Sequence, residues 1–201
     1  MEQVSNSQRV VELARKNGVL RTQDVVAAGI PRVTLTRLVR AGRLVRAGRG
    51  LYALPGRSLS EHEGLVQVAT HASQGVFCLL TALRFHDLTS QSPFEIWLAI
   101  PNKARSPSLD YPPLRIVRFS GDSLTSGIET HTIDRTEIRV YCVAKTVADC
   151  FKYRNKIGLD VALEALHQAW REKRATMDEL WKNARICRVA NVMRPYLESL
   201  I

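Results

Sequence analysis

Glycine and proline divide the start of the chain into segments that are too short for anything but a small module. Gly18, Gly29 and Gly42 each stand at the end of a short helical pattern, where glycine is a natural C-terminal cap. Pro31 suits the first turn of a third helix, because its missing N–H would have no partner there. Two short helices joined at Gly29 have the spacing of a helix-turn-helix.

The starts of the first two predicted helices carry capping residues. Ser5 or Ser7 can cap the first helix. Thr22 can cap the second helix, and Asp24 then stands in its first turn, where the helix dipole favours a negative charge. Residues 18–21, between the two helices, are long enough only for a connecting strand.

A β-hairpin is expected directly after the third helix. Residues 44–46 and 51–54 are β-prone runs, and the connection between them, residues 47–50, contains two glycines. Glycine lets the backbone take the positive φ that a tight hairpin requires. Helix, short strand, helix, helix and hairpin is the order of a winged helix-turn-helix.

Positive charge is concentrated in this module. The chain carries a net charge of +10, from 29 Lys and Arg against 19 Asp and Glu. Residues 1–57 hold 11 basic and three acidic residues, a net charge of +8, whereas residues 58–201 carry only +2. A surface that is basic only for solubility would intersperse both signs. The asymmetry favours a polyanion partner, most often nucleic acid.

The predicted third helix has the pattern of a recognition helix. At 100° per residue, Leu35 and Leu38 fall on one side and are expected to face the core. A recognition helix contacts base edges in the major groove from its N-terminal half. Arginine can grip guanine O6 and N7, and a threonine methyl can touch the thymine methyl. We therefore predict that Thr34, Thr36 and Arg37 recognise base sequence.

The other arginines of the module are expected to contact the DNA backbone. Arg32 and Arg40, on the third helix, are predicted to lie toward phosphates. Arg43, Arg46 and Arg49 belong to the predicted hairpin, where they would grip the backbone or enter the minor groove. Such contacts fix the position of a protein on DNA more than its sequence preference.

After a linker that contains Pro55 and Gly56, residues 58–201 mix strand and helix patterns. Strands are predicted at residues 94–100, 114–119, 129–133 and 136–143, and helices at residues 61–71, 79–85, 145–153, 159–173, 177–183 and 189–200. The predicted fold class is therefore α+β. A winged helix-turn-helix domain, residues 1–57, precedes a mixed α+β domain, residues 58–201, that ends in helices.

This larger part shows no catalytic pattern. A restriction-type nuclease needs an acidic residue and then a strand with Asp/Glu-x-Lys, and the sequence has no such triplet, no phosphate-binding P-loop and no H-x-x-x-H. The polar run from Lys145 to Cys150 is explained as a helix start, with Thr146 as its cap and Asp149 three residues on. We expect no enzyme, no metal and no cofactor.

The cysteines and the hydropathy also bear on the cellular compartment in which the protein acts. Cys78, Cys142, Cys150 and Cys187 are far apart and form no C-x-x-C, so buried free thiols are expected. No run approaches the roughly 18 apolar residues of a membrane span, and the N-terminus lacks the layout of a signal peptide. A cytoplasmic protein is expected.

Short runs in a fixed order carry a family resemblance. The first are Gly-Val-Leu-Arg-Thr (18–22), Gly-Ile-Pro-Arg (29–32) and Leu-Tyr-Ala-Leu-Pro (51–55). Further runs are Phe-Cys-Leu-Leu-Thr-Ala-Leu (77–83), Trp-Leu-Ala-Ile-Pro (97–101), Val-Arg-Phe-Ser-Gly (117–121), Lys-Thr-Val-Ala-Asp-Cys-Phe-Lys-Tyr-Arg (145–154) and Ala-Leu-Glu-Ala-Leu (162–166). On these runs the chain resembles the AbiEi antitoxins and transcriptional regulators of bacterial type IV toxin–antitoxin systems.

The resemblance implies a two-domain repressor. Its winged helix would bind inverted repeats in double-stranded DNA of its own promoter, with contacts carried over to Arg32, Thr34, Thr36, Arg37, Arg40, Arg46 and Arg49. Its C-terminal domain would provide antitoxicity and help two copies act together on DNA. The toxin of such systems resembles a nucleotidyltransferase, and the antitoxin opposes it without forming a stable complex.

Three alternatives stay open on the sequence. The C-terminal domain could be a nuclease or a nucleotide-handling enzyme that the winged helix brings to DNA. It could instead hold the toxin directly, as an interaction platform. The chain could also be a stand-alone regulator without a toxin, because such regulators share this layout.

Overall fold

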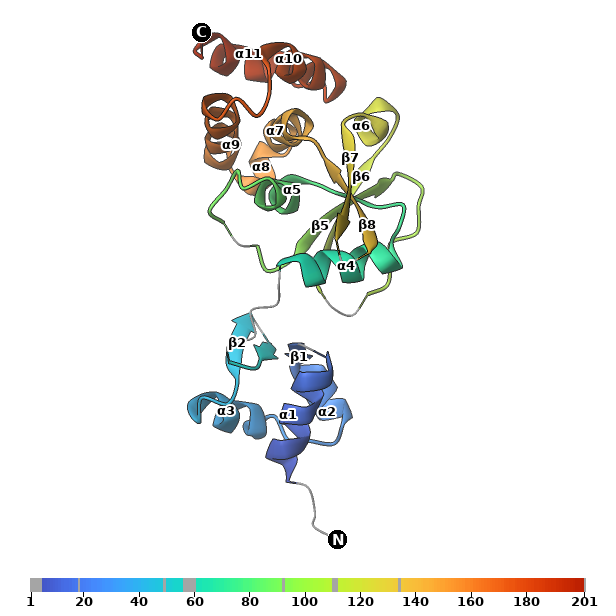
Figure 1. Ribbon diagram of the computed structural model, residues 1–201, viewed down its shortest axis with the longest axis vertical. Coiled ribbons are helices and arrows are strands. Elements are labelled where there is room, and N and C mark those ends of the chain that lie inside the picture. The colour runs from blue at the N-terminus through green and yellow to red at the C-terminus, as the bar shows by residue number, and fades with distance from the viewer. Residues whose placement is uncertain are drawn as a thin grey trace. The chain divides into compact units, whose positions relative to one another are not determined.

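The protein folds as two compact units, Met1–Glu61 and His62–Ile201. The structure is a computed structural model that describes residues 5–17, 19–48, 50–55, 61–91, 93–109, 112–133 and 135–200. The expected domain boundary, between residues 57 and 58, lies outside the described residues. Helices, then a small sheet, then a larger sheet with C-terminal helices follow one another along the chain, which confirms the predicted α+β class (Figure 1).

The N-terminal unit has the predicted order of elements. These are α1 (Asn6–Asn17), β1 (Val19–Arg21), α2 (Thr22–Ala27), α3 (Val33–Arg40), β2 (Val45–Gly48) and β3 (Leu51–Ala53). The strands pair antiparallel in the order β1-β3-β2, so the connecting strand completes the hairpin sheet. A helix-turn-helix with a small sheet beside it is the winged helix-turn-helix layout.

One apolar core holds this unit together. Val10 and Ala14 of α1, Val25 of α2 and Leu35 and Leu38 of α3 are buried in the same cluster. Their spacing of three or four residues puts them on one face of each helix. Helix α3 therefore packs through the face of Leu35 and Leu38, as its sequence pattern predicts.

The C-terminal unit contains the rest of the described elements. These are α4 (Glu61–His71), β4 (Val76–Phe77), α5 (Leu79–Phe85), β5 (Ile96–Pro101), β6 (Leu114–Phe119), α6 (Asp122–Thr125), β7 (Ile128–Ile133), β8 (Thr136–Tyr141), α7 (Val143–Lys152), α8 (Arg154–Ile157), α9 (Leu159–Arg171), α10 (Met177–Ile186) and α11 (Ala190–Glu198). Within the described residues, the strands form a mixed sheet in the order β6-β5-β4-β8-β7.

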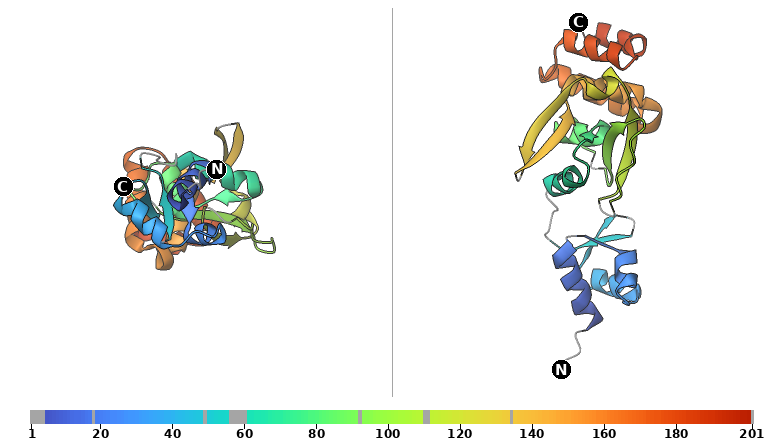
Figure 2. Two further views of the ribbon diagram at one scale, coloured as in Figure 1. Left: turned by 90° about the horizontal axis from the view of Figure 1, so that it is seen from below. Right: turned by 90° about the vertical axis from the view of Figure 1, so that its right-hand side faces the viewer.

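Each face of this sheet is covered by helices. Phe77, Leu98 and Val140 lie in one buried cluster with residues of α4. Their strand neighbours, such as Val76 and Ala99, lie in a second cluster that includes α5, α7 and the C-terminal helices. This alternation follows from the two-residue period of a strand. Figure 2 shows α4 and the C-terminal helices on opposite sides of the sheet.

The start of α7 differs from the prediction. Helix α7 begins at Val143, so Thr146 is an interior residue and not a cap. Its hydroxyl donates to the carbonyl oxygen of Tyr141, 3.0 Å away, and the side chain is buried. The predicted cap is therefore wrong, because the helix begins at Val143, a buried apolar residue that the sequence pattern placed in the preceding strand.

Three of the four cysteines are buried free thiols, as expected, and the fourth is half-buried. Cys78, Cys150 and Cys187 are buried and Cys142 is half-buried, all as free thiols. Burial raises the pKa of each of these thiols above its ordinary value.

Among the described residues, no helix is both long enough and apolar enough to cross a membrane.

Candidate nucleic-acid interface

Helix α3 presents a continuous exposed stripe. Val33, Thr36, Arg37 and Arg40 are all exposed, and their spacing of three, one and three residues places them on one side of the helix. Val33 is 51% exposed, so its methyl groups are available for contact. The opposite face of α3 is buried. A helix of this kind can enter a major groove with its exposed side toward the bases.

Thr34 does not share this stripe. Its side chain is only 7% exposed and lies on the same buried face as Leu35 and Leu38. One residue advances a helix by about 100°, which is enough to carry a side chain from the groove side to the core side. Thr34 is therefore removed from the predicted base-contacting residues, whereas Thr36 and Arg37 remain candidates.

Hydrogen bonds from Ile30 and from Arg9 of α1 hold the turn between α2 and α3. Gly29 adopts a φ of 73°, in the left-handed region that favours glycine. Ile30 is buried, and its N–H donates to the carbonyl oxygen of Val25 at 3.0 Å. The guanidinium of Arg9 donates to the carbonyl of Ala28 at 3.1 Å, which ties α1 to this turn. These contacts fix the direction in which α3 leaves the turn.

Arg32 lies at the start of α3, where it forms the N-cap. Its side chain is exposed, as is that of Arg40 in the last turn. The predicted phosphate-contacting residues thus stand at the two ends of the exposed stripe. This is where a helix lying in a groove comes nearest to the flanking backbone.

The hairpin carries the other predicted arginines. Arg43 and Arg46 are exposed, and Arg46 lies opposite Tyr52 in the β2–β3 register. Arg49 lies outside the described residues. The carbonyl oxygen of Gly50 accepts the N–H of Thr22 at 3.0 Å and its hydroxyl at 3.3 Å. The turn of the hairpin, directly before β3, is therefore tied to the first residue of α2.

Five of the exposed arginines of this unit keep their guanidinium groups free of partners among the described residues. Within the described residues, no ion pair or side-chain hydrogen bond involves the guanidinium groups of Arg32, Arg37, Arg40, Arg43 and Arg46. The carboxylate of Asp24 is used at the start of α2, where it accepts the backbone N–H of Arg21 at 3.0 Å. Unpaired guanidinium groups on one small unit give a positive field that attracts phosphates.

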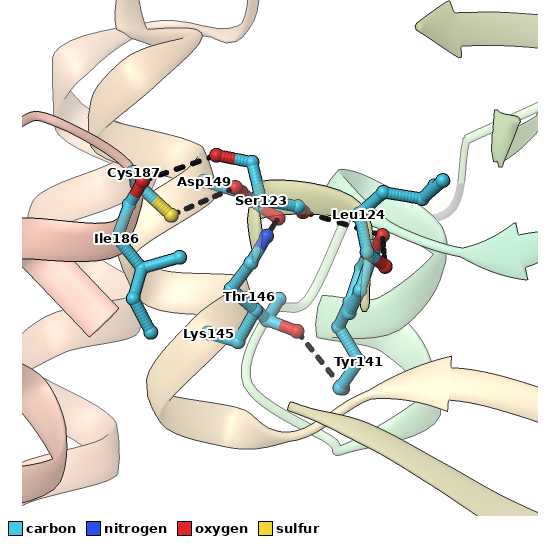
Figure 3. A network of polar contacts seen from close by, with 8 residues as sticks. All are labelled: Ser123, Leu124, Tyr141, Lys145, Thr146, Asp149, Ile186 and Cys187. Carbon is cyan, nitrogen blue, oxygen red and sulfur yellow. Dashed lines mark hydrogen bonds and ion pairs between the residues drawn. The ribbon is translucent and has the colours of Figure 1, made fainter. Parts of the chain in front are cut away.

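The C-terminal unit holds a buried polar network that sequence patterns do not reveal (Figure 3). The ammonium of Lys145 and the carboxylate of Asp149 form an ion pair, and both side chains are fully buried. Cys187 donates from its thiol to the same carboxylate at 3.2 Å. Burial raises the pKa of Asp149 above its usual value, and the nearby ammonium of Lys145 opposes this rise.

Aromatic rings complete the surroundings of this ion pair. The Lys145 ammonium lies 4.1 Å from the centre of the Tyr141 ring and 4.8 Å from that of Phe119. The Tyr141 hydroxyl donates to the carbonyl oxygen of Leu124 at 2.7 Å. Each buried charge therefore has a partner, as a buried ion pair requires. The network joins α7 to β8, α6 and the end of α10, and it has the character of a structural core.

A family model of known proteins matches most of the N-terminal unit. Among solved structures, the crystal structure of the RV2827C protein from Mycobacterium tuberculosis is similar, with a TM-score of 0.47 and 16% identity over 100% of this chain and 78% of that chain. The chain matches no curated protein. A family model described as the AbiEi antitoxin transcriptional regulators matches residues 8–55, which span the helices and the hairpin described above. The resemblance to the AbiEi family is thereby confirmed for this N-terminal part of the chain.

Proposed function

We propose that the chain is a DNA-binding transcriptional repressor and the antitoxin of a type IV toxin–antitoxin system. The single observation that carries the DNA-binding part is the exposed stripe of Val33, Thr36, Arg37 and Arg40 on α3. The match of residues 8–55 to a family of regulators and antitoxins supports the regulatory part. The structure contributes the placement of side chains, and the family contributes the biological role.

The proposed complex places α3 in the major groove of duplex DNA. Arg37 would donate to guanine O6 and N7, and the methyl groups of Val33 and Thr36 would contact thymine methyl groups. Arg32 and Arg40 would bind flanking phosphates. Arg43, Arg46 and Arg49 would hold the backbone beside the groove and fix the position of the module without selecting a sequence.

The remaining parts of the proposal concern the operon. We propose that two copies bind inverted repeats upstream of their own genes and associate with each other on that DNA. The C-terminal unit would oppose a nucleotidyltransferase-like toxin without a stable complex and without catalysis of its own. The protein would act in the cytoplasm, where its promoter and its toxin are.

A footprint of the DNA upstream of the gene tests the repressor part. Protection of two inverted half-sites is expected, with centres separated by about one helical turn, 10–10.5 base pairs, or a multiple of it. The variant Arg37→Ala is expected to lose this protection. Arg105→Ala removes an equal charge from an exposed position of the C-terminal unit and serves as the matched control. No protection by the wild-type protein would contradict the proposal.

Two further assays test the antitoxin part. Expression of the neighbouring toxin gene is expected to stop growth, and the full chain is expected to restore it without copurifying with the toxin. A stable copurified complex would favour a direct interaction platform instead. Reproducible metal-dependent cleavage of operator DNA by the purified chain would contradict the non-enzymatic role.

A further inference from the structure

A polar cavity of about 570 Å³ opens in the C-terminal unit, far in sequence from the DNA-binding helix. Three separate segments of the chain line it: residues 118–123 at the end of β6 and the start of α6, residues 152–153 at the end of α7, and residues 185, 186 and 188 at the end of α10. Its charged lining residues are Arg118, Asp122, Lys152, Arg185 and Arg188. Four cations against one carboxylate make the cavity strongly basic.

Hydrogen bonds to the buried network hold the walls of this cavity together. The hydroxyl of Ser123 donates to the carbonyl oxygen of Ile186 at 3.1 Å, so α6 is tied to the end of α10 (Figure 3). The next residue, Cys187, donates to buried Asp149. Arg185 and Arg188 thus flank two residues that are anchored in the core. The backbone that carries Arg185 and Arg188 is therefore held in place, whereas their side chains are exposed.

The cations differ in how much of their hydrogen-bonding capacity is used. The guanidinium of Arg118 donates to the carbonyl oxygens of Pro101, Asn102 and Ala104. By contrast, no ion pair or side-chain hydrogen bond involves Arg185 or Arg188 within the part of the chain that the structure describes, and both side chains are exposed. Two arginines with unused donors therefore face the same polar cavity.

We propose that this cavity binds the phosphate group of a small phosphorylated ligand of nucleotide size. Arginine donates pairs of parallel N–H groups that match the oxygens of a phosphate, and such charge-assisted bonds are among the strongest hydrogen bonds in proteins. The volume of the cavity lies in the usual range of small-molecule sites, about 300–1,000 Å³. Lys152 adds a point charge, and the half-buried ring of Tyr153 provides an aromatic wall. The site is separate from the DNA-binding proposal and does not depend on it.

The backbone conformation of Arg188 allows a specific test of this site. Arg188 follows α10 with a φ of 59°, a conformation that favours glycine. Arg188→Gly therefore removes a cation from the cavity and relieves backbone strain at the same time. Lys173 follows α9 with a φ of 55° and lies outside this cavity, so Lys173→Gly makes the matched change of charge and backbone elsewhere. Neither variant is expected to unfold the protein.

The experiment measures binding of AMP, adenosine and inorganic phosphate to the full chain by calorimetry. Wild-type protein is expected to bind AMP and inorganic phosphate but not adenosine. Arg188→Gly and Arg185→Gln are each expected to weaken AMP binding about ten-fold or more, the factor that loss of one charge-assisted hydrogen bond to a phosphate brings. Lys173→Gly and Arg37→Ala are expected to bind AMP as the wild type does.

Each other outcome would overturn the proposal. Equal binding of adenosine and AMP would show that no phosphate is recognised. No binding of AMP or inorganic phosphate at millimolar concentration would show that the cavity takes no such ligand. Equal losses in Lys173→Gly and Arg188→Gly would reduce the effect to net charge. Loss of duplex DNA affinity in Arg188→Gly as large as in Arg37→Ala would assign the cavity to the DNA-binding surface instead.

Discussion

The backbone N–H and the side-chain hydroxyl of Thr22 both donate to the carbonyl oxygen of Gly50, at 3.0 and 3.3 Å. Thr22 is the first residue of α2, and Gly50 directly precedes β3. One carbonyl therefore joins the helix-turn-helix to its hairpin. If α3 lies in a major groove, this connection sets where the arginines of the hairpin meet the neighbouring backbone.

Thr22→Val removes the hydroxyl and keeps the backbone donor. We expect the N-terminal unit to lose about 1 kcal/mol of stability, the usual net value of one hydrogen bond. Urea unfolding of the full chain, followed by a probe in the N-terminal unit, measures the change. Thr36→Val makes the same substitution at an exposed position of α3 and is expected to leave stability within about 0.5 kcal/mol of wild type. Equal losses in both variants would contradict the assigned role of Thr22.

The two threonines of α3 test the assignment of base contacts. Thr36 is exposed, whereas Thr34 is buried. Replacement of each by valine is the same chemical change, so only the position differs. Thr36→Val is expected to change the discrimination between operator base pairs, because a second methyl group replaces the hydroxyl beside the thymine methyl that the Thr36 methyl contacts. Thr34→Val is expected to bind every operator variant as the wild type does, in a gel-shift series with single base-pair substitutions.

The buried ion pair of the C-terminal unit predicts a strong asymmetry between single and double variants. Lys145→Met leaves the Asp149 carboxylate buried without its partner, and a loss of about 3–5 kcal/mol in unfolding free energy is expected. The double variant Lys145→Met with Asp149→Leu replaces both charges by apolar groups. It is expected to be more stable than Lys145→Met alone. Additive losses, measured by urea unfolding, would contradict the coupling between the two side chains.

Alkaline pH is expected to destabilise the same region. Burial first of all, then the charge of Asp149, raises the pKa of Cys187 to about 12, from an ordinary value of 9.0. The native state therefore favours the neutral thiol, so its stabilising contribution is complete below about pH 9 and is lost as the pH rises toward 12. Unfolding free energies measured at pH 8 and about pH 10.5 should fall with pH. Cys187→Ala should show a shallower fall, and a flat profile in the wild type would contradict the burial of the thiol.

Much of the architecture could be predicted from local patterns. Strand β6 and helix α5 have the bounds that their apolar runs indicate, and the turns at Gly29 and Gly42 both adopt positive φ. Strand β4, with two residues, and helices α6 and α8, with four each, are too short to leave a period in the sequence. Their structure is imposed by the sheet and helices around them, so pattern reasoning missed them.

The two candidate sites also differ in how far the sequence predicts them. The exposed stripe of α3 lies within eight consecutive residues, so a helical wheel finds most of it and fails only for Thr34, near the boundary between the two faces. The basic cavity combines Arg118, Lys152 and Arg188 from three distant segments. Only the folded sheet and the buried network bring these residues together, and no local spacing in the sequence predicts that they are neighbours.

The dependence of DNA affinity on salt tests the central claim most directly. The full chain and Arg46→Ala would each be titrated with the duplex upstream of the gene at several salt concentrations. We predict that affinity falls linearly on a double-logarithmic plot, by about 0.9 in slope for each phosphate contact, and that Arg46→Ala lowers the slope by about 1. An affinity for duplex DNA that does not change with salt, or the same slope in both proteins, would contradict the account.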